Sequence, residues 1–132
     1  MSSNNEQIKL TLPINAAYVS AARLTASSVA NRLNFDIEEI EDIKVAVSEA
    51  CTYIIKNPKL NDKNDFKIEF DFTKDNVKIM FSVLSDSKIN VDEDEMSLKV
   101  IGAIMDKLAF DFDNSSFKMI IEKKHIDDSF GE

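Results

Sequence analysis

Glycine, proline and cysteine are scarce in this chain of 132 residues, which has two glycines, two prolines and one cysteine. The single Cys51 cannot form a disulfide within the chain, and its position in a predicted helix favours a buried, reduced thiol. A reduced thiol in turn favours a cytoplasmic location. The glycines, Gly102 and Gly131, lie far apart, so neither belongs to a glycine-rich phosphate loop.

Positive charge and long apolar runs are also lacking. Sixteen Lys and Arg residues stand against 24 Asp and Glu residues, which gives a formal net charge of −8. Phosphates repel an acidic surface, so we expect no direct binding to nucleic acid. No apolar run approaches the ~20 residues needed to cross a bilayer. Met1 to Gln7 lack the apolar segment of a signal peptide, so we expect neither a leader nor a membrane span.

Hydrophobic residues make up 44% of the chain, enough to bury a core. We predict a single domain over residues 1–132, with an ordered core at 7–124 and tails at 1–6 and 125–132. The one histidine, His125, falls in the second tail, and we expect it at the surface without a catalytic role.

The longest stretch with helical periodicity runs from Glu39 to Lys56 without glycine or proline. Apolar residues recur in it at spacings of three and four, which predicts a face that packs into a core. This face carries Ile40, Ile43, Val47, Ala50 and Ile54. A second face, typical of a helix wall that lines a site, carries Asp42, Ala46, Glu49 and Tyr53. A simpler interpretation is that Glu49 is a solvated helix glutamate.

Alternation of apolar and polar residues predicts five strands. They cover Ile8–Leu12, Phe66–Phe72, Val77–Val83, Ala109–Phe112 and Phe117–Glu122. The second and third are separated by a short polar turn and form a hairpin.

Helical spacing predicts two further helices, at about residues 16–33 and at Met96–Leu108. The first would leave Arg23 turned toward solvent or a partner, and Asp36 caps the long helix that follows. The buried face of the first helix would carry Tyr18, Ala22, Val29 and Leu33. Runs of strands and runs of helices together predict an α+β fold, a two-layer sandwich.

Residues 40–52, Ile-Glu-Asp-Ile-Lys-Val-Ala-Val-Ser-Glu-Ala-Cys-Thr, resemble the N box of the anti-sigma-factor serine/threonine kinases of the RsbW and SpoIIAB type. These kinases belong to the GHKL, or histidine kinase-like, ATPase superfamily. Residues 18–25 and 104–108 extend the resemblance over most of the chain, in the family's order and spacing. It implies the Bergerat fold, a mixed, largely antiparallel sheet covered by helices on one face, with ATP held between helices and a flexible lid.

The resemblance implies roles for residues of the N box. In the family a glutamate serves as general base, and an asparagine four residues later ligates Mg2+, which prefers oxygen ligands. Glu49 matches the glutamate. Tyr53 stands at the asparagine position, and a phenol is a poor, bulky ligand for Mg2+. Asn57 lies one turn further on and does not fit the spacing.

Two glycine boxes of the family contact the rest of the nucleotide. The first resembles Asp-x-Gly, whose aspartate accepts a hydrogen bond from the adenine amino group, and Val83 and Ser85 stand at these positions. The second resembles Gly-x-Gly at the start of the last helix, where backbone amides bind phosphate. Glu95 and Ser97 stand there, and residues 92–94 of the short lid are all acidic.

Each of these changes disfavours ATP, so we expect no cofactor, although the family uses ATP and Mg2+. The positions of the degenerate site are Glu49, Tyr53, Val83, Ser85, Glu95 and Ser97. Glu49 would then be at most a vestigial general base. An alternative is a different ligand in the same cleft, with Glu49 and Tyr53 on its wall.

Three functions follow from the resemblance. The first is a regulatory binding protein that engages a sigma factor, an anti-anti-sigma (STAS) protein, or both, through a surface that includes Arg23. The second is an active kinase with Glu49 as base, and the third is a purely structural dimeric domain. A homodimer is implied by the resemblance and favoured by the unpaired sheet edge that strand Ile8–Leu12 would leave. Arg23 could instead be a solvated helix arginine.

Overall fold

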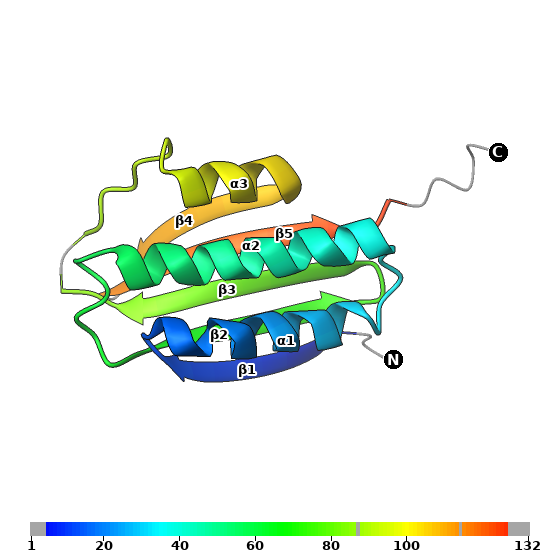
Figure 1. Cartoon of the computed structure of the whole chain (residues 1–132), viewed down its shortest axis with the longest axis horizontal. Helices are drawn as coiled ribbons and strands as arrows, with labels where there is room; N and C mark the ends of the chain where they lie inside the picture. The colour runs from blue at the N-terminus through cyan, green and yellow to red at the C-terminus, as the bar shows by residue number, and fades with distance from the viewer. Residues whose placement is uncertain (1–4, 87, 114, 127–132) are drawn as a thin grey trace.

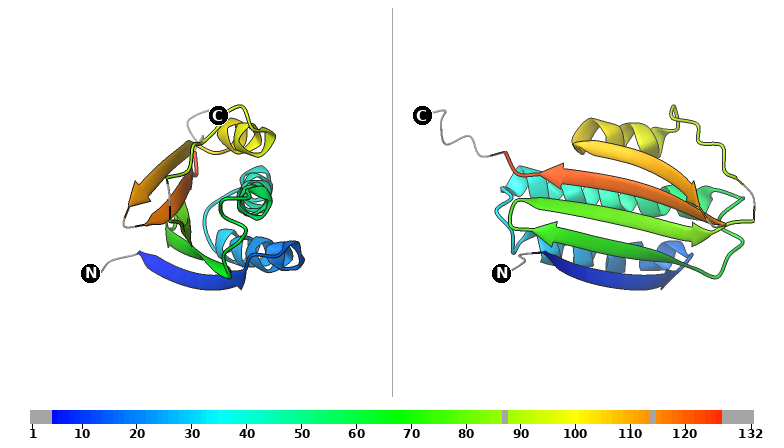
Figure 2. Two further views of the ribbon diagram at one scale, coloured as in Figure 1. Left: turned by 90° about the vertical axis from the view of Figure 1, so that its left-hand side faces the viewer. Right: turned by 180° about the vertical axis from the view of Figure 1, so that it is seen from behind.

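Helices on one face of a β-sheet give the chain a two-layer α+β fold (Figure 1 and Figure 2). The computed structural model describes residues 5–86, 88–113 and 115–126. In chain order the elements are β1 (Glu6–Pro13), the 3-10 helix η1 (Ala16–Tyr18), α1 (Val19–Ala30), α2 (Ile37–Lys56), β2 (Asp65–Thr73), β3 (Asn76–Leu84), α3 (Met96–Ile104), β4 (Lys107–Asp113) and β5 (Ser116–Lys124). The predicted α+β sandwich is confirmed.

The strands lie in the order β1-β2-β3-β5-β4, and each of the four pairings in the described chain is antiparallel. The resemblance implied a mixed, largely antiparallel sheet. In the described part of the chain the sheet is entirely antiparallel. A tight turn joins β2 to β3, and so short a connection permits only antiparallel neighbours. β1 lies at one edge of the sheet, as expected for the strand at residues 8–12.

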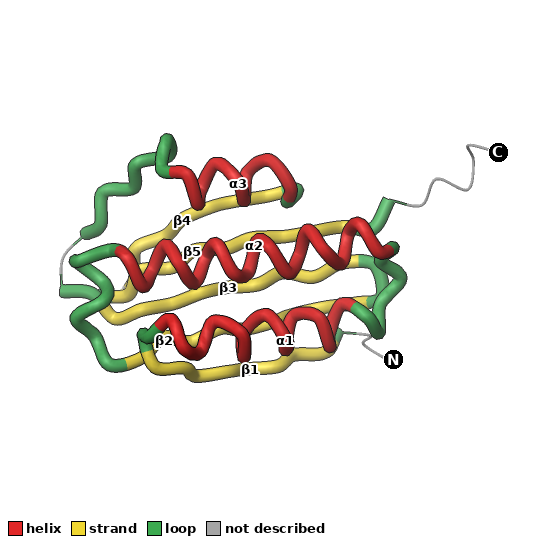
Figure 3. The backbone as a smooth tube through the Cα atoms, viewed as in Figure 1, coloured by secondary structure: helices red, strands yellow, loops and turns green. Residues whose placement is uncertain are grey.

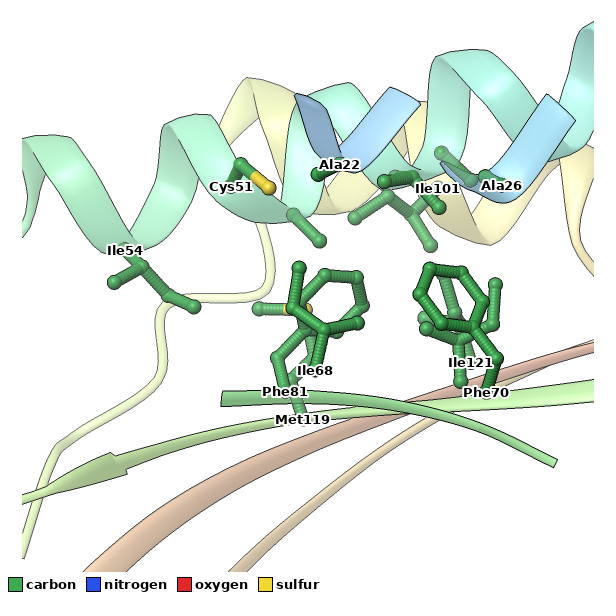
Figure 4. Packing of buried hydrophobic residues seen from close by; sticks show 14 of the residues in the cluster. Ala22, Ala26, Cys51, Ile54, Ile68, Phe70, Phe81, Ile101, Met119 and Ile121 are labelled. Carbon is green, nitrogen blue, oxygen red and sulfur yellow. The ribbon is translucent and has the colours of Figure 1, made fainter. Parts of the chain in front are cut away.

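One hydrophobic core fills the space between sheet and helices, and Figure 4 shows sheet side chains such as Phe70 and Phe81 pointing toward the helices. The alternation predicted for the hairpin is confirmed, because its inward side chains are 0–6% exposed. They are Phe66, Ile68, Phe70, Phe72, Val77, Ile79, Phe81 and Val83. No helix in the described ranges has the length and apolar character that a bilayer crossing demands.

α2 crosses the middle of the sheet with α1 on one side and α3 on the other (Figure 2 and Figure 3). Its predicted core face is buried, except that Ile40 is half-buried. The second face is less open than predicted, since Ala46 is fully buried and Tyr53 is 6% exposed. Part of this face contacts β5, since the Tyr53 ring stacks on Phe117 and Asp42 forms an ion pair with Lys123.

Two helices are shorter than the sequence predicted, α3 at its C-terminal end and α1 at its N-terminal end. α3 ends at Ile104, because Leu108 pairs with Ile121 in the β4–β5 ladder instead of continuing the helix. At the other end of the chain, Tyr18 closes the short η1 and is 45% exposed, so it does not belong to the buried face of α1. Ala22 and Val29 are buried there as predicted.

A capping box begins α2, as the sequence predicted for Asp36. The Glu39 N–H donates to Asp36 Oδ1 at 2.8 Å, and the Asp36 N–H donates to Glu39 Oε1 at 2.9 Å. His125 is not a free surface residue, because its Nδ1 lies 2.8 Å from Glu39 Oε1 and its ring packs edge-on against Phe35. The rest of the predicted tail, residues 127–132, lies outside the described residues.

Candidate functional site

Two of the predicted site residues, Tyr53 and Glu95, lie together at one end of the sandwich, where α2 ends and α3 begins (Figure 1). A hollow of about 190 Å³ lies there. It is lined by Tyr53, Lys56, Asn57, Pro58, Asn90, Asp92 and Glu95. The end of α2 thus faces the segment that leads into α3.

Tyr53 forms the inner wall of this hollow. Its ring stacks on Phe117 of β5, with ring centroids 6.2 Å apart and an interplanar angle of 26°. Burial raises the pKa of the Tyr53 phenol, a hydrogen bond with the Asn57 side chain opposes this shift, and the Glu95 and Asp92 carboxylates add to it. The phenol is therefore neutral near pH 7.

Asn57 ends α2 and has two hydrogen-bonding roles. Its Oδ1 accepts from the Lys59 N–H at 2.9 Å, and its side chain bonds the Tyr53 hydroxyl. The amide closes the turn after the helix and holds the phenol at the same time, which fixes the wall of the hollow.

The positions of the first glycine box are buried. Val83 is 2% exposed and pairs with Phe117, so its side chain lies in the core behind the Tyr53 ring. Ser85 is also 2% exposed, and its N–H donates to the Ser115 carbonyl at 2.8 Å. Asp86 points away from the hollow, since its carboxylate lies 3.4 Å from Lys63 Nζ.

The positions of the second glycine box form the start of α3. Glu95 is the N-cap residue, and its Oε1 accepts from the Ser97 N–H at 3.4 Å. Asp92 Oδ1 accepts from the Asp94 N–H at 3.0 Å, and the Asp92 carbonyl accepts from the Glu95 N–H at 3.0 Å. This folded turn directs the Asp92 and Glu95 carboxylates into the lining of the hollow, whereas Glu93 and Asp94 do not line it.

Glu49 lies on α2 one turn before Tyr53 and is half-buried. Within the described part of the chain, its side chain forms no hydrogen bond or ion pair. Nor does the same part contain a group of three or more His, Cys, Asp or Glu side chains that could hold a metal ion.

Arg23 stands apart from the hollow, at the packing of α1 against α2. Its Nη1 donates to Ser48 Oγ at 3.1 Å and the side chain is half-buried, so it contacts α2, and its place in a partner surface stays a prediction. Cys51 is fully buried as predicted. Burial raises the pKa of its thiol to about 12, with Arg23 opposing the shift.

Two parts of the site were missed in the sequence. Phe117 was predicted only as a strand residue, although its inward position placed it under the end of α2. Asn90 lies in an irregular segment without periodicity, so no sequence signal placed it beside Tyr53.

A family model for the histidine kinase-like ATPase domain matches residues 12–120, so the chain belongs to this family. Its relatives include the serine-protein kinases RsbW of Bacillus cereus (strain ZK / E33L) and Bacillus thuringiensis subsp. konkukian (strain 97-27). Each is 37% identical over 95 residues, a match that covers 72% of this chain and 58% of the relative. The chain thus spans less than two thirds of the length of these relatives. The resemblance to RsbW-type proteins predicted from residues 40–52 is confirmed.

A solved structure supports the fold. The chain is similar to the crystal structure of the RsbU and RsbW domains of a Mycobacterium tuberculosis protein, with a TM-score of 0.71 and 12% identity. The match covers 90% of this chain and 32% of the other. The Bergerat fold implied by the resemblance is therefore the fold of this chain.

Proposed function

We propose that this protein is a regulatory binding protein of the anti-sigma-factor type, whose nucleotide site no longer serves ATP. It would act by protein–protein contact in the cytoplasm, as a homodimer, on a sigma factor, an anti-anti-sigma (STAS) protein, or both. One observation supports the proposal. Tyr53, at the metal-ligand position of the family resemblance, is stacked on Phe117, and the acidic residues Asp92 and Glu95 line the hollow beside it.

The metal position does not fit Mg2+. Mg2+ takes carboxylate, amide or water oxygens in octahedral geometry. Tyr53 offers a neutral phenol that is hydrogen-bonded to Asn57 and stacked on Phe117, so it cannot turn its oxygen to a metal without breaking both interactions. Phosphoryl transfer depends heavily on that ion.

The base position does not fit adenine. Val83 has no acceptor for the amino group and is buried in the core. The adjoining hollow of about 190 Å³ is smaller than the roughly 300–1,000 Å³ typical of small-molecule sites. An adenine amino group without its partner would also lose about 1–3 kcal/mol, one to two decades in affinity.

The phosphate position does not fit a polyanion. A helix N-terminus binds phosphate through its free N–H groups. At α3 the Glu95 carboxylate already accepts from the Ser97 N–H, and Asp92 places a second negative charge beside it. A triphosphate would meet like charge and an occupied donor.

Glu49 favours a second candidate, an active kinase that phosphorylates an anti-anti-sigma factor on serine or threonine. It stands at the general-base position, half-buried and without a partner in the described part of the chain. The relatives named above are serine-protein kinases. In this case Glu49 would orient the attacking hydroxyl of the substrate.

Two measurements separate the two candidate functions. The first is a calorimetric titration of ATP with excess Mg2+, and the second is an assay of radiolabel transfer from ATP to STAS proteins of the source organism. The proposal predicts no binding at micromolar ATP and no label transfer. Label transfer that Glu49→Gln abolishes and the surface change Glu41→Gln preserves would establish the kinase. Binding of purified sigma and STAS candidates is measured on the same samples, and no binding to any of them would refute the regulatory role.

A further inference from the structure

The hollow between α2 and α3 is shaped and charged for a cation. We propose that it receives an arginine side chain from a basic partner protein. The inference rests on the proposed function, because it assigns a new occupant to a cleft that does not take ATP. A hollow of about 190 Å³ can hold one side chain head group but not a nucleotide.

The wall of the hollow is an aromatic ring held in place from both sides. Tyr53 is 6% exposed, stacks on Phe117 and is hydrogen-bonded to Asn57. A guanidinium group is attracted to the face of such a ring at about 6 Å or less, more strongly where water is excluded. Asn90 adds a side-chain amide, whose oxygen can accept from the guanidinium N–H donors.

Two carboxylates complete the lining. Asp92 and Glu95 both raise the pKa of Tyr53, so their charge reaches the inner wall of the hollow. Each is held by a backbone N–H within its own turn. Among the described residues, neither lies within ion-pair distance of a basic group. An incoming guanidinium would form charge-assisted hydrogen bonds with them.

The helix ends reinforce this preference. α2 ends at Lys56, so its last carbonyls, which carry partial negative charge, lie beside the hollow. The opposing positive end of α3 is offset by Glu95 at its N-cap. Lys56 brings one positive charge against the two carboxylates, and the chain as a whole carries −8, which favours a basic partner.

An NMR titration of the ¹⁵N-labelled full chain tests the site, with acetyl-Gly-Arg-Gly-amide as probe. The matched control peptide replaces arginine by citrulline, which keeps the shape and removes the charge. We expect saturable shifts at the Asn57 and Asn90 side-chain amides. The Kd for the arginine peptide should be at least tenfold lower than for the citrulline peptide.

Two double variants separate the site from general acidity. The double variant Asp92→Asn, Glu95→Gln should raise the Kd for the arginine peptide at least tenfold. Glu93→Gln with Asp94→Asn removes the same charge from the same turn, outside the lining, and should change the Kd less than twofold. Amide spectra show that each variant is folded.

Three outcomes would overturn the proposal: equal affinity for both peptides, equal weakening by both double variants, or no saturable shift up to a concentration on the order of 10 mM. ATP titrated into the same samples reports on the proposed function separately. Micromolar ATP binding would refute that function, whereas the comparison of peptides decides the cation site.

Discussion

Replacing Tyr53 by the asparagine of the family should destabilise the domain without restoring ATP binding. The change removes a ring that is 6% exposed and stacked on Phe117, and it places a smaller polar side chain over Phe117 and Val83. The Mg2+ ligand returns, but the valine at the base position and Glu95 at the phosphate position remain.

The expected magnitude follows from what the buried ring contributes to stability. Truncation of a buried aromatic side chain costs about 3–5 kcal/mol, and an aromatic pair contributes about 0.5–1.5 kcal/mol beyond its buried area. Asparagine retains part of the volume, so we expect the free energy of unfolding to fall by about 3 kcal/mol. For 132 residues the unfolding entropy near the midpoint is about 0.28 kcal/mol/K, so Tm should fall by about 10 °C.

Thermal unfolding and ATP calorimetry on the same variant provide the measurement. Tyr18→Asn is the matched control, because Tyr18 is 45% exposed and its replacement should change stability by less than about 0.5 kcal/mol. An unchanged Tm for Tyr53→Asn would show that the ring does not fill the site. Micromolar ATP binding by this variant would show that one residue, and not three changed positions, separates this chain from an active ATPase.

Four further predictions concern the core, the partner surface, assembly and pH. Phe70→Asp should cost at least about 4 kcal/mol, because Phe70 is fully buried and an unpaired charge there is expensive; an unchanged Tm would remove it from the core. Arg23→Ala should weaken binding of a sigma or STAS partner at least tenfold. Ser48→Ala removes the same hydrogen bond but keeps the guanidinium, so it should leave partner binding unchanged. Equal effects of the two variants would show that Arg23 acts by stabilising the packing of α1 on α2. Sedimentation equilibrium should give about twice 14.9 kDa, and a monomer at high concentration would contradict the dimer. The contribution of Cys51 to stability should be constant below pH 9.0 and fall as the pH rises toward about 12, because the unfolded chain loses the Cys51 proton first. Cys51→Ala should remove that part of the fall, at most about 1.4 kcal/mol per pH unit, in denaturant titrations at pH 8 and pH 10.

The hairpin and the long helix could be predicted because local pattern and tertiary burial agree there. Phe66 to Phe72 alternate strictly, and the sheet buries one set of these side chains as the pleat requires. The capping box of Asp36 and Glu39 is a local signal, and its geometry is independent of the rest of the fold.

Other features depend on neighbours that one sequence does not reveal. Arg23 was expected to turn toward solvent or a partner, and its hydrogen bond to Ser48 could not be predicted because it depends on how α1 packs against α2. Helical spacing continued past Ile104, and only the pairing of Leu108 with Ile121 places that residue in a strand. Tyr53 and the acidic residues Asp92 and Glu95 of the hollow were noted from the family resemblance, whereas its amide Asn90 and the stacking partner Phe117 were not, because their proximity to Tyr53 depends on the tertiary fold.

The Glu39 carboxylate has a consequence for the order of folding. It accepts from the Asp36 N–H at the start of α2, and it also accepts from the Ile126 N–H at 3.3 Å, across 87 residues of chain. Closing so long a loop is entropically costly, so this contact can form only after β5 has joined the sheet. The start of α2 and the end of β5 should therefore exchange their amide protons together, as one cooperative unit at the end of the molecule opposite the hollow.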